Sequence, residues 1–83
     1  HERWAQFLEL HPADIAQFLA MVSKEHCQHL FLRLPITLRI EVFSEYSTNM
    51  KLFTLSFLND QDKAGILNNT PIDELTDLFD ELS

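Results

Sequence analysis

The chain has 83 residues, of which 46% are hydrophobic, and its formal net charge is −7. This length suits a single domain over residues 1–83, and seven Phe with one Trp supply the apolar surface for a core that a disordered chain would lack. One Gly and three Pro leave little of the turn chemistry that β-hairpins need, so we expect an all-α fold. The sequence contains no run of 18 uncharged apolar residues, which is about the length that a membrane-spanning helix needs. Its acidic charge argues against nucleic acid as a partner.

The first ten residues carry an apolar set that is typical of a helix, namely Trp4, Phe7, Leu8 and Leu10. We interpret residues 1–10 as the end of a helix that precedes the rest of the domain and covers one end of it. Trp4 is expected to pack as part of this cover rather than to bind a ligand, because large aromatic side chains are far more often core residues.

From residue 11 onward the sequence divides without gaps into six blocks of twelve residues. Ser and Asn cap helices by accepting a hydrogen bond from a free backbone N–H, and Pro fits the first helical turn. Such residues open five of the blocks, so each block is predicted to form one helix. The six opening residues are His11, Ser23, Pro35, Ser47, Asn59 and Pro71.

Three positions of the repeat predict the buried face of each helix. The eighth, ninth and twelfth residues are related as i, i+1 and i+4, and such residues form one stripe along a helix. The ninth residue is apolar in all six blocks: Leu19, Phe31, Phe43, Leu55, Leu67 and Phe79. The eighth and the twelfth are apolar in five of six, with Thr54 and Thr70 as the exceptions.

Helices of about ten residues are too short to persist alone in water, because nucleation costs more free energy than so few hydrogen bonds return. They must therefore stack on one another. Short connections make successive helices neighbours, so we expect antiparallel helical hairpins with a 24-residue repeat, arranged as a compact superhelix.

Motifs of known chemistry are scarce in this sequence. His26, Cys27 and His29 cluster on one predicted helix, but zinc sites need further ligands at spacings such as CxxC or HExxH, which do not occur. Cys27 is therefore expected to pack as a small apolar residue, and as a single cysteine it cannot form an internal disulfide. The chain contains neither a Gly-rich phosphate loop nor a nucleophile motif, which argues against an enzyme.

The last block holds the most informative acidic residues. Residues 59–83 carry seven acidic side chains and one basic one, Lys63. Asp73 and Asp77 are related as i and i+4, so their carboxylates should share one helix face, where they could hold a hydrated Mg²⁺ ion. The alternative is structural: Thr70 to Asp73 also matches a helix-start cap, Asp73 would favour the positive end of the helix dipole, and Asp77 would merely be solvated.

Three stretches, in order and in register, resemble the N-terminal cytoplasmic domain of the MgtE family of magnesium transporters. They are Leu10 to Ala16 (LHPADIA), Leu34-Pro35 with Ile40 to Phe43 (IEVF), and Asp73 to Leu78 (DELTDL). The likeness covers residues 10 to 82. It implies a right-handed helical superhelix on the cytoplasmic side of the cell (inner) membrane, followed by CBS domains and a pore in a homodimeric parent protein.

The resemblance also implies a mechanism and a set of site residues. In this family Mg²⁺ bound between the N-terminal and CBS domains screens their acidic faces and draws them together, which favours the closed pore. The corresponding acidic positions of this sequence are Glu41, Asp73 and Asp77. Because the CBS ligands belong to another domain of the same polypeptide, the chain should hold at most half of each site and bind Mg²⁺ weakly.

A second interpretation is a protein-interaction scaffold, similar to the middle domain of the flagellar motor switch protein, which also consists of short helices. A scaffold should expose a contiguous hydrophobic patch, whereas a magnesium sensor should expose an acidic face. The acidic last third of the chain favours the sensor.

Overall fold

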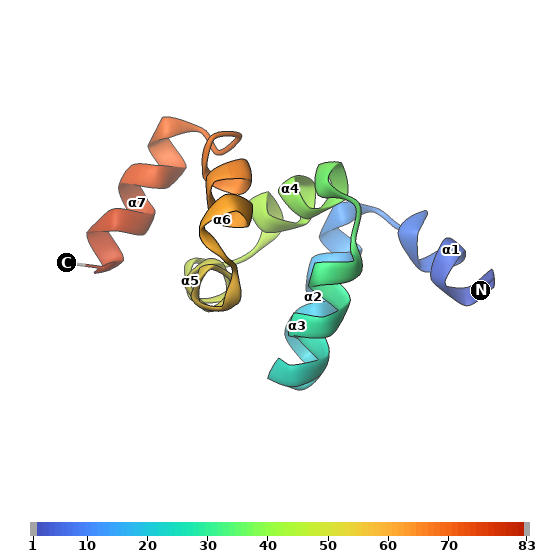
Figure 1. The fold of residues 1–83 in the computed structure, drawn as a ribbon. Helices are drawn as coiled ribbons and strands as arrows, with labels where there is room; N and C mark the ends of the chain where they lie inside the picture. Colours follow the sequence, from blue (N-terminus) through green and yellow to red (C-terminus); the bar gives the residue numbers. More distant parts are fainter. Residues whose placement is uncertain (1, 83) are drawn as a thin grey trace.

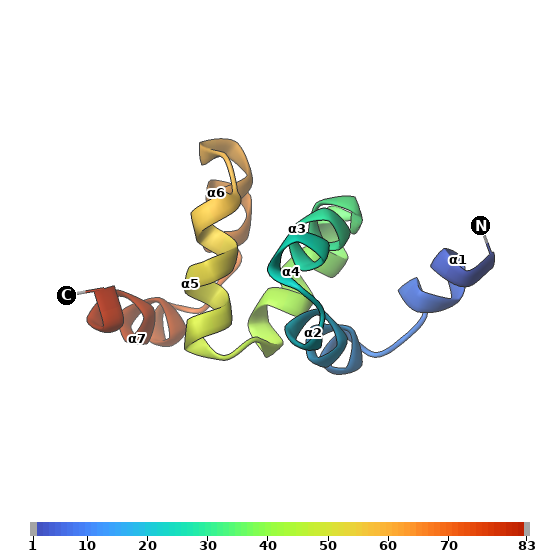
Figure 2. The same ribbon diagram turned by 90° about the horizontal axis from the view of Figure 1, so that it is seen from below.

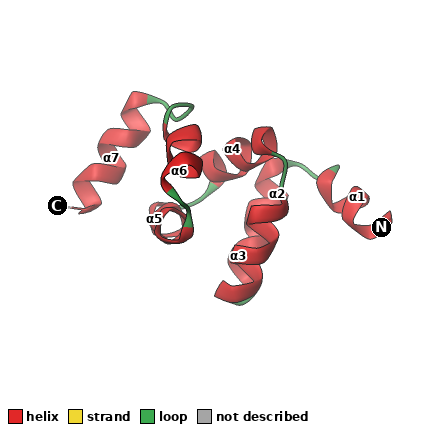
Figure 3. Cartoon of the chain, in the orientation of Figure 1, coloured by secondary structure: helices red, strands yellow, loops and turns green. Residues whose placement is uncertain are grey.

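A computed structural model describes residues 2–82 of the chain, and within this range it contains helices and loops but no strand (Figure 3). Helices cover more than two thirds of the chain, which confirms the all-α fold class, and a short helix lies upstream of residue 11 as expected. The helices are α1 (Glu2–Leu8), α2 (Pro12–Met21), α3 (Lys24–Arg33), α4 (Ile36–Glu45), α5 (Thr48–Phe57), α6 (Asp60–Leu67) and α7 (Ile72–Leu82).

The residues that open the twelve-residue blocks set the helix boundaries. Helices α2 to α7 each begin one residue after a block opener. The side-chain oxygens of Ser23, Ser47 and Asn59 accept hydrogen bonds from the backbone N–H three residues later, at 3.2, 3.3 and 2.8 Å. These caps satisfy donors that the first helical turn leaves free, so local chemistry alone fixes where these three helices start.

The helices form an elongated stack with extents of 42 × 23 × 22 Å. The two ends of the chain lie at opposite ends of this stack in both views (Figures 1 and 2). Helix α2 packs against α3 and α4, α4 packs against α6, and α5 packs against α7. Close packing therefore joins helices that are one or two places apart in the chain, whereas the expected superhelix and its right-handed sense both stay predictions.

Burial of the predicted stripe changes gradually along the stack. The ninth block residue is buried in α2, α3 and α4, but Phe79 in α7 is 53% exposed. The eighth residue shows the opposite trend, because Phe18 in α2 is 45% exposed whereas Val42, Thr54, Ile66 and Leu78 are buried. In α2 the ninth residue is the buried one, in α4 both the eighth and the ninth are buried, and in α7 only the eighth is buried.

Ring contacts explain this trend. Phe31, a ninth residue, lies 6.2 Å from Tyr46 and 6.0 Å from Phe57 between ring centroids, and both partners come later in the chain. Phe18, an eighth residue, lies 5.4 Å from Phe7 of α1, which comes earlier. The ninth position therefore faces the following helices and the eighth faces the preceding ones.

Two ion pairs occupy equivalent places in the repeat, and the hydrophobic pattern did not predict them. Arg39 Nη1 lies 3.8 Å from Asp62 Oδ1, and Lys51 Nζ lies 3.8 Å from Glu74 Oε1. Each pair joins the fifth residue of one block to the fourth residue of the block two further along. Lys51 is buried, with Nζ 5.8 Å from the centre of the Phe43 ring, so this pair lies partly inside the core.

Replacement of Phe43 by Ala should lower the free energy of unfolding by about 3 to 5 kcal/mol, because this ninth residue is fully buried and truncation leaves a cavity. Phe79→Ala is the matched control, since it removes the same atoms from the same block position at an exposed site and should cost less than about 1 kcal/mol. Denaturant melts measure both values. Equal losses in the two variants would mean that burial at the ninth position is assigned incorrectly.

Candidate acidic site and core cavity

Helix α7 carries two exposed carboxylates one turn apart. Asp73 and Asp77 are both exposed, and Asp73 lies in the first turn of the helix. Glu74 differs from them, because it contacts Lys51 of α5 and its Oε2 atom is buried without a hydrogen-bond partner. The sequence-predicted pair therefore occupies a free face of α7, while the neighbouring carboxylate holds the helix against the stack.

The structure argues against one part of the structural alternative, the helix-start cap that begins at Thr70. The Thr70 hydroxyl donates a 2.8 Å hydrogen bond to the Ile66 carbonyl, so it closes the end of α6 instead of capping α7. Within residues 2–82 the side-chain carboxylates of Asp73 and Asp77 form neither a hydrogen bond nor an ion pair. Asp73 retains a favourable position in the first turn, where the helix dipole stabilises negative charge.

Glu41, the third predicted site residue, lies on α4 and is exposed. Its backbone carbonyl accepts a 2.6 Å hydrogen bond from the Ser44 hydroxyl. No three His, Cys, Asp or Glu side chains of the described residues are grouped so that they could hold a metal ion, so Glu41 does not join Asp73 and Asp77 in one cluster. The assignment of these three residues to a metal stays a prediction, and any site they form would need ligands from elsewhere.

The His and Cys residues of α3 do not converge on a common point. Cys27 is buried, whereas His26 and His29 are exposed. The His26 ring Nδ1 instead lies 2.9 Å from the Ser23 hydroxyl, at the start of the same helix. These positions agree with the interpretation of Cys27 as a core residue.

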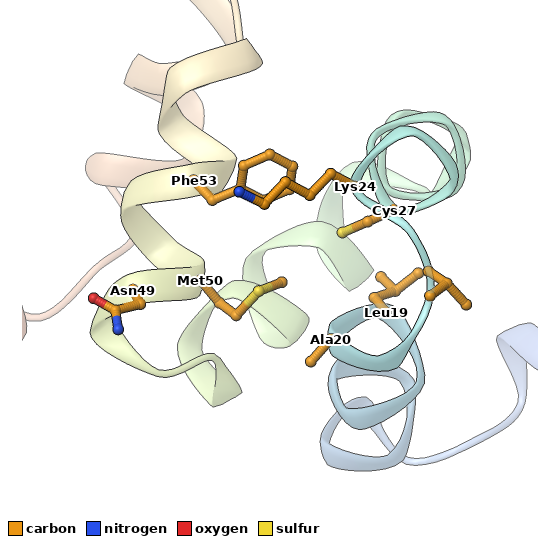
Figure 4. Close-up of a pocket in the computed structure, with 8 residues that line it drawn as sticks. Leu19, Ala20, Lys24, Cys27, Asn49, Met50 and Phe53 are labelled. Atoms are coloured by element: carbon orange, nitrogen blue, oxygen red, sulfur yellow. The ribbon is translucent and has the colours of Figure 1, made fainter.

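A cavity of about 310 Å³ lies between α2, α3 and α5 (Figure 4). Most of its lining is apolar, and the amine of Lys24 lies 5.5 Å from the centre of the Phe53 ring across the opening. The cavity is at the lower limit of ligand pockets in size, and it has no converging set of polar groups that would orient a substrate. It is lined by Leu19, Ala20, Val22, Lys24, Cys27, Asn49, Met50 and Phe53.

Burial governs the chemistry of the single thiol. Burial raises the pKa of Cys27 above its ordinary value, and the nearby Tyr46 hydroxyl, 4.0 Å from Sγ, opposes this only in part. The pKa of Tyr46 is raised as well, by burial first and then by Cys27. Both groups therefore stay neutral at physiological pH, and a neutral thiol is a poor nucleophile and metal ligand.

An apolar groove of about 350 Å³ marks the other end of the molecule. Trp4 and Phe7 of α1 stack at 5.5 Å between ring centroids, and the Arg33 guanidinium lies 4.6 Å from the centre of the Trp4 ring. Together with the contact between Phe7 and Phe18, the Arg33 contact places side chains of α1 against α2 and α3. The groove is lined by Arg3, Trp4, Phe7, Phe18, Leu30 and Arg33.

The buried thiol leads to a prediction about reactivity. In native conditions at pH 8, Cys27 should react with a disulfide reagent about 100-fold more slowly than in denaturant, because a local opening that costs about 3 kcal/mol must precede reaction. The absorbance of the released thiolate measures both rates. Similar rates in the two conditions would show that the thiol is accessible in the folded domain.

Comparison with known proteins agrees with the resemblance in the sequence. No helix among the described residues combines the length and the apolar character that crossing a bilayer requires. No curated protein and no solved structure matches the chain. The sequence model of one family, the MgtE intracellular N domain, matches residues 10–83. That family belongs to magnesium transporters and not to enzymes, and the matched range covers all six blocks of the repeat. This chain therefore belongs to the MgtE intracellular N domain family.

Proposed function

We propose that this domain senses cytosolic Mg²⁺ and regulates the magnesium transporter of which it is a part, from the cytoplasmic side of the cell (inner) membrane. The observation that carries the proposal is the pair Asp73 and Asp77, two exposed carboxylates one helical turn apart with no partner within residues 2–82. Because the chain belongs to the MgtE intracellular N domain family, we take the regulated protein to be a magnesium transporter. The acidic pair is the place where the Mg²⁺ ion would bind.

The chemistry of Mg²⁺ suits such a pair. Mg²⁺ prefers oxygen ligands, keeps several of its waters and often uses only one or two carboxylates. Two like charges one turn apart on a helix repel each other and repel any other acidic surface. A hydrated cation between this face and an acidic face of a CBS domain in the same polypeptide would remove that repulsion and hold the two domains together. Glu41 would act at a separate point on α4.

Regulation then follows from a difference in affinity. Mg²⁺ can favour the closed pore only to the extent that it binds the arrangement with associated domains better than the separated one. The ion acts from outside the pore, so the carboxylates of this domain would set the concentration at which transport stops and not the rate through an open pore. In the homodimeric parent, each subunit would carry its own copy of this sensor.

The scaffold function remains a second candidate, and the groove at α1 favours it. Stacked Trp4 and Phe7 beside two arginines make a surface on which an acidic amphipathic segment could pack. In this case the partner would bind at the opposite end of the stack from Asp73 and Asp77, so substitutions at the two ends distinguish the functions.

For the isolated domain we predict a dissociation constant for Mg²⁺ of about 1 mM or weaker, because the carboxylates of the second domain are missing. A tenfold excess of Mg²⁺ over that constant should stabilise the fold by only about 1.4 kcal/mol. Titration calorimetry and thermal melts with Mg²⁺ measure these values. Micromolar binding by the isolated domain would contradict a half-site.

In the full-length parent, Asp73→Ala combined with Asp77→Ala should raise the Mg²⁺ concentration that closes the pore and leave single-channel conductance unchanged, while Glu41→Ala should act in the same direction more weakly. Patch-clamp recordings across a Mg²⁺ series measure both quantities. Glu25→Ala is the matched control, because Glu25 is also an exposed acid in a first helical turn. If the double variant closes at the wild-type Mg²⁺ concentration but melts at a lower temperature, these carboxylates are structural and the site assignment is wrong.

A further inference from the structure

The two ion pairs of the stack join the same two block positions, so the repeat predicts where the next such pair would form. Arg39 pairs with Asp62 of α6, and Lys51 pairs with Glu74 of α7. In each case a basic fifth residue of one block meets an acidic fourth residue of the block two further along. The corresponding earlier positions are both apolar, Cys27 and Met50, and they line the same cavity. The fifth residue of one block and the fourth residue of the block two further along are thus either oppositely charged or both apolar.

Lys63 is the next residue in this series. It is the fifth residue of its block, lies on α6 and is partly buried. Unlike Arg39 and Lys51, it forms no ion pair within residues 2–82. By the same rule, the acidic partner of Lys63 would lie on a helix two places after α6. That helix would pack against α6 in the way that α7 packs against α5, and none of the described helices occupies this place.

Apolar side chains on α7 indicate the same missing neighbour. Phe79 is 53% exposed and Ile72 is 79% exposed. Phe79 is a ninth block residue, and ninth residues face the following helices. The clearest example is Phe43, whose ring is covered by Lys51, the fifth residue of the next block. A helix that paired its fourth residue with Lys63 would therefore place its fifth residue over Phe79.

We propose that Lys63 of α6, with Ile72 and Phe79 of α7, binds one further amphipathic helix that presents a carboxylate to Lys63 from its first turn and covers Phe79 with the next residue. Charge determines the register of this helix. Lys63 is the single basic residue beside seven acidic ones in residues 59–83, so a carboxylate of the docking helix that faced this surface at any other point would be repelled. The partner is thus an acid-bearing helix that docks in one position, separate from Asp73 and Asp77.

The test supplies such a helix to the whole chain. A copy of residues 72–82 is fused directly after Ser83. Ser83 falls where a seventh block would open, so the copy of Glu74 occupies the fourth position of the new block. The extended chain should melt about 5 °C above the original, which is the shift expected for a modest gain in stability at this size. Replacement of that glutamate by Gln, or Lys63→Met, should each remove a large part of the gain.

Combined substitutions decide whether the contact is the proposed one. In the extended chain the two replacements together should lower the melting temperature no further than either alone, because they remove the same pair. Phe79→Ser should abolish the gain in the extended chain. Lys24→Gln, which removes an exposed cation from α3, is the control and should leave the gain intact.

Three results would overturn the proposal. The first is an extended chain that melts at the original temperature. The second is a gain that persists in full with Lys63→Met, which would show that the added helix does not use this cation. The third is a concentration-dependent dimer of the unextended chain, observed by light scattering and dissociated by Phe79→Ser, because the surface would then bind a second copy and not a separate helix.

Discussion

The whole structure depends on the fact that its helices are too short to be stable alone. Helices of eight to eleven residues build every block from α2 to α7, and such segments acquire stability only by burying a face against neighbours. The closest packing joins α2 with α3 and α4, α4 with α6, and α5 with α7. Each helix thus supports those before and after it, and the buried residues form a continuous row and not a central sphere.

This constraint explains why a single helix can have two different roles. Helix α7 has to direct Leu78 and Glu74 toward the stack, where the first is buried and the second meets Lys51. Residues on the remaining face are free of that requirement. Asp73 and Asp77 lie there, so the packing of α7 does not depend on their charges. Glu41 has the same freedom on α4, but far enough from α7 that it does not belong to the same cluster.

The features that could be predicted from the sequence are those that local chemistry controls. Helix starts depend on caps such as Ser23 and Ser47, and an i, i+4 relation such as that of Asp73 and Asp77 follows from helix geometry alone. The ion pairs of Arg39 and Lys51 were missed because they depend on which helices pack together. The exposure of Phe79 was missed for a related reason: a block pattern describes a helix with neighbours on both sides, whereas α7 lies at the end of the described stack.

The pairing of helices that are close in sequence has a consequence for how the domain forms. Contacts between near neighbours close short loops, and proteins with such low contact order fold quickly. A stack of this type can also begin from any few adjacent helices and grow outward by one helix at a time. The segment from α2 to α4, which holds most of the buried aromatic residues, could thus fold while the rest of the polypeptide is still being synthesised. The domain would then be folded before the synthesis of any later part of the polypeptide is complete.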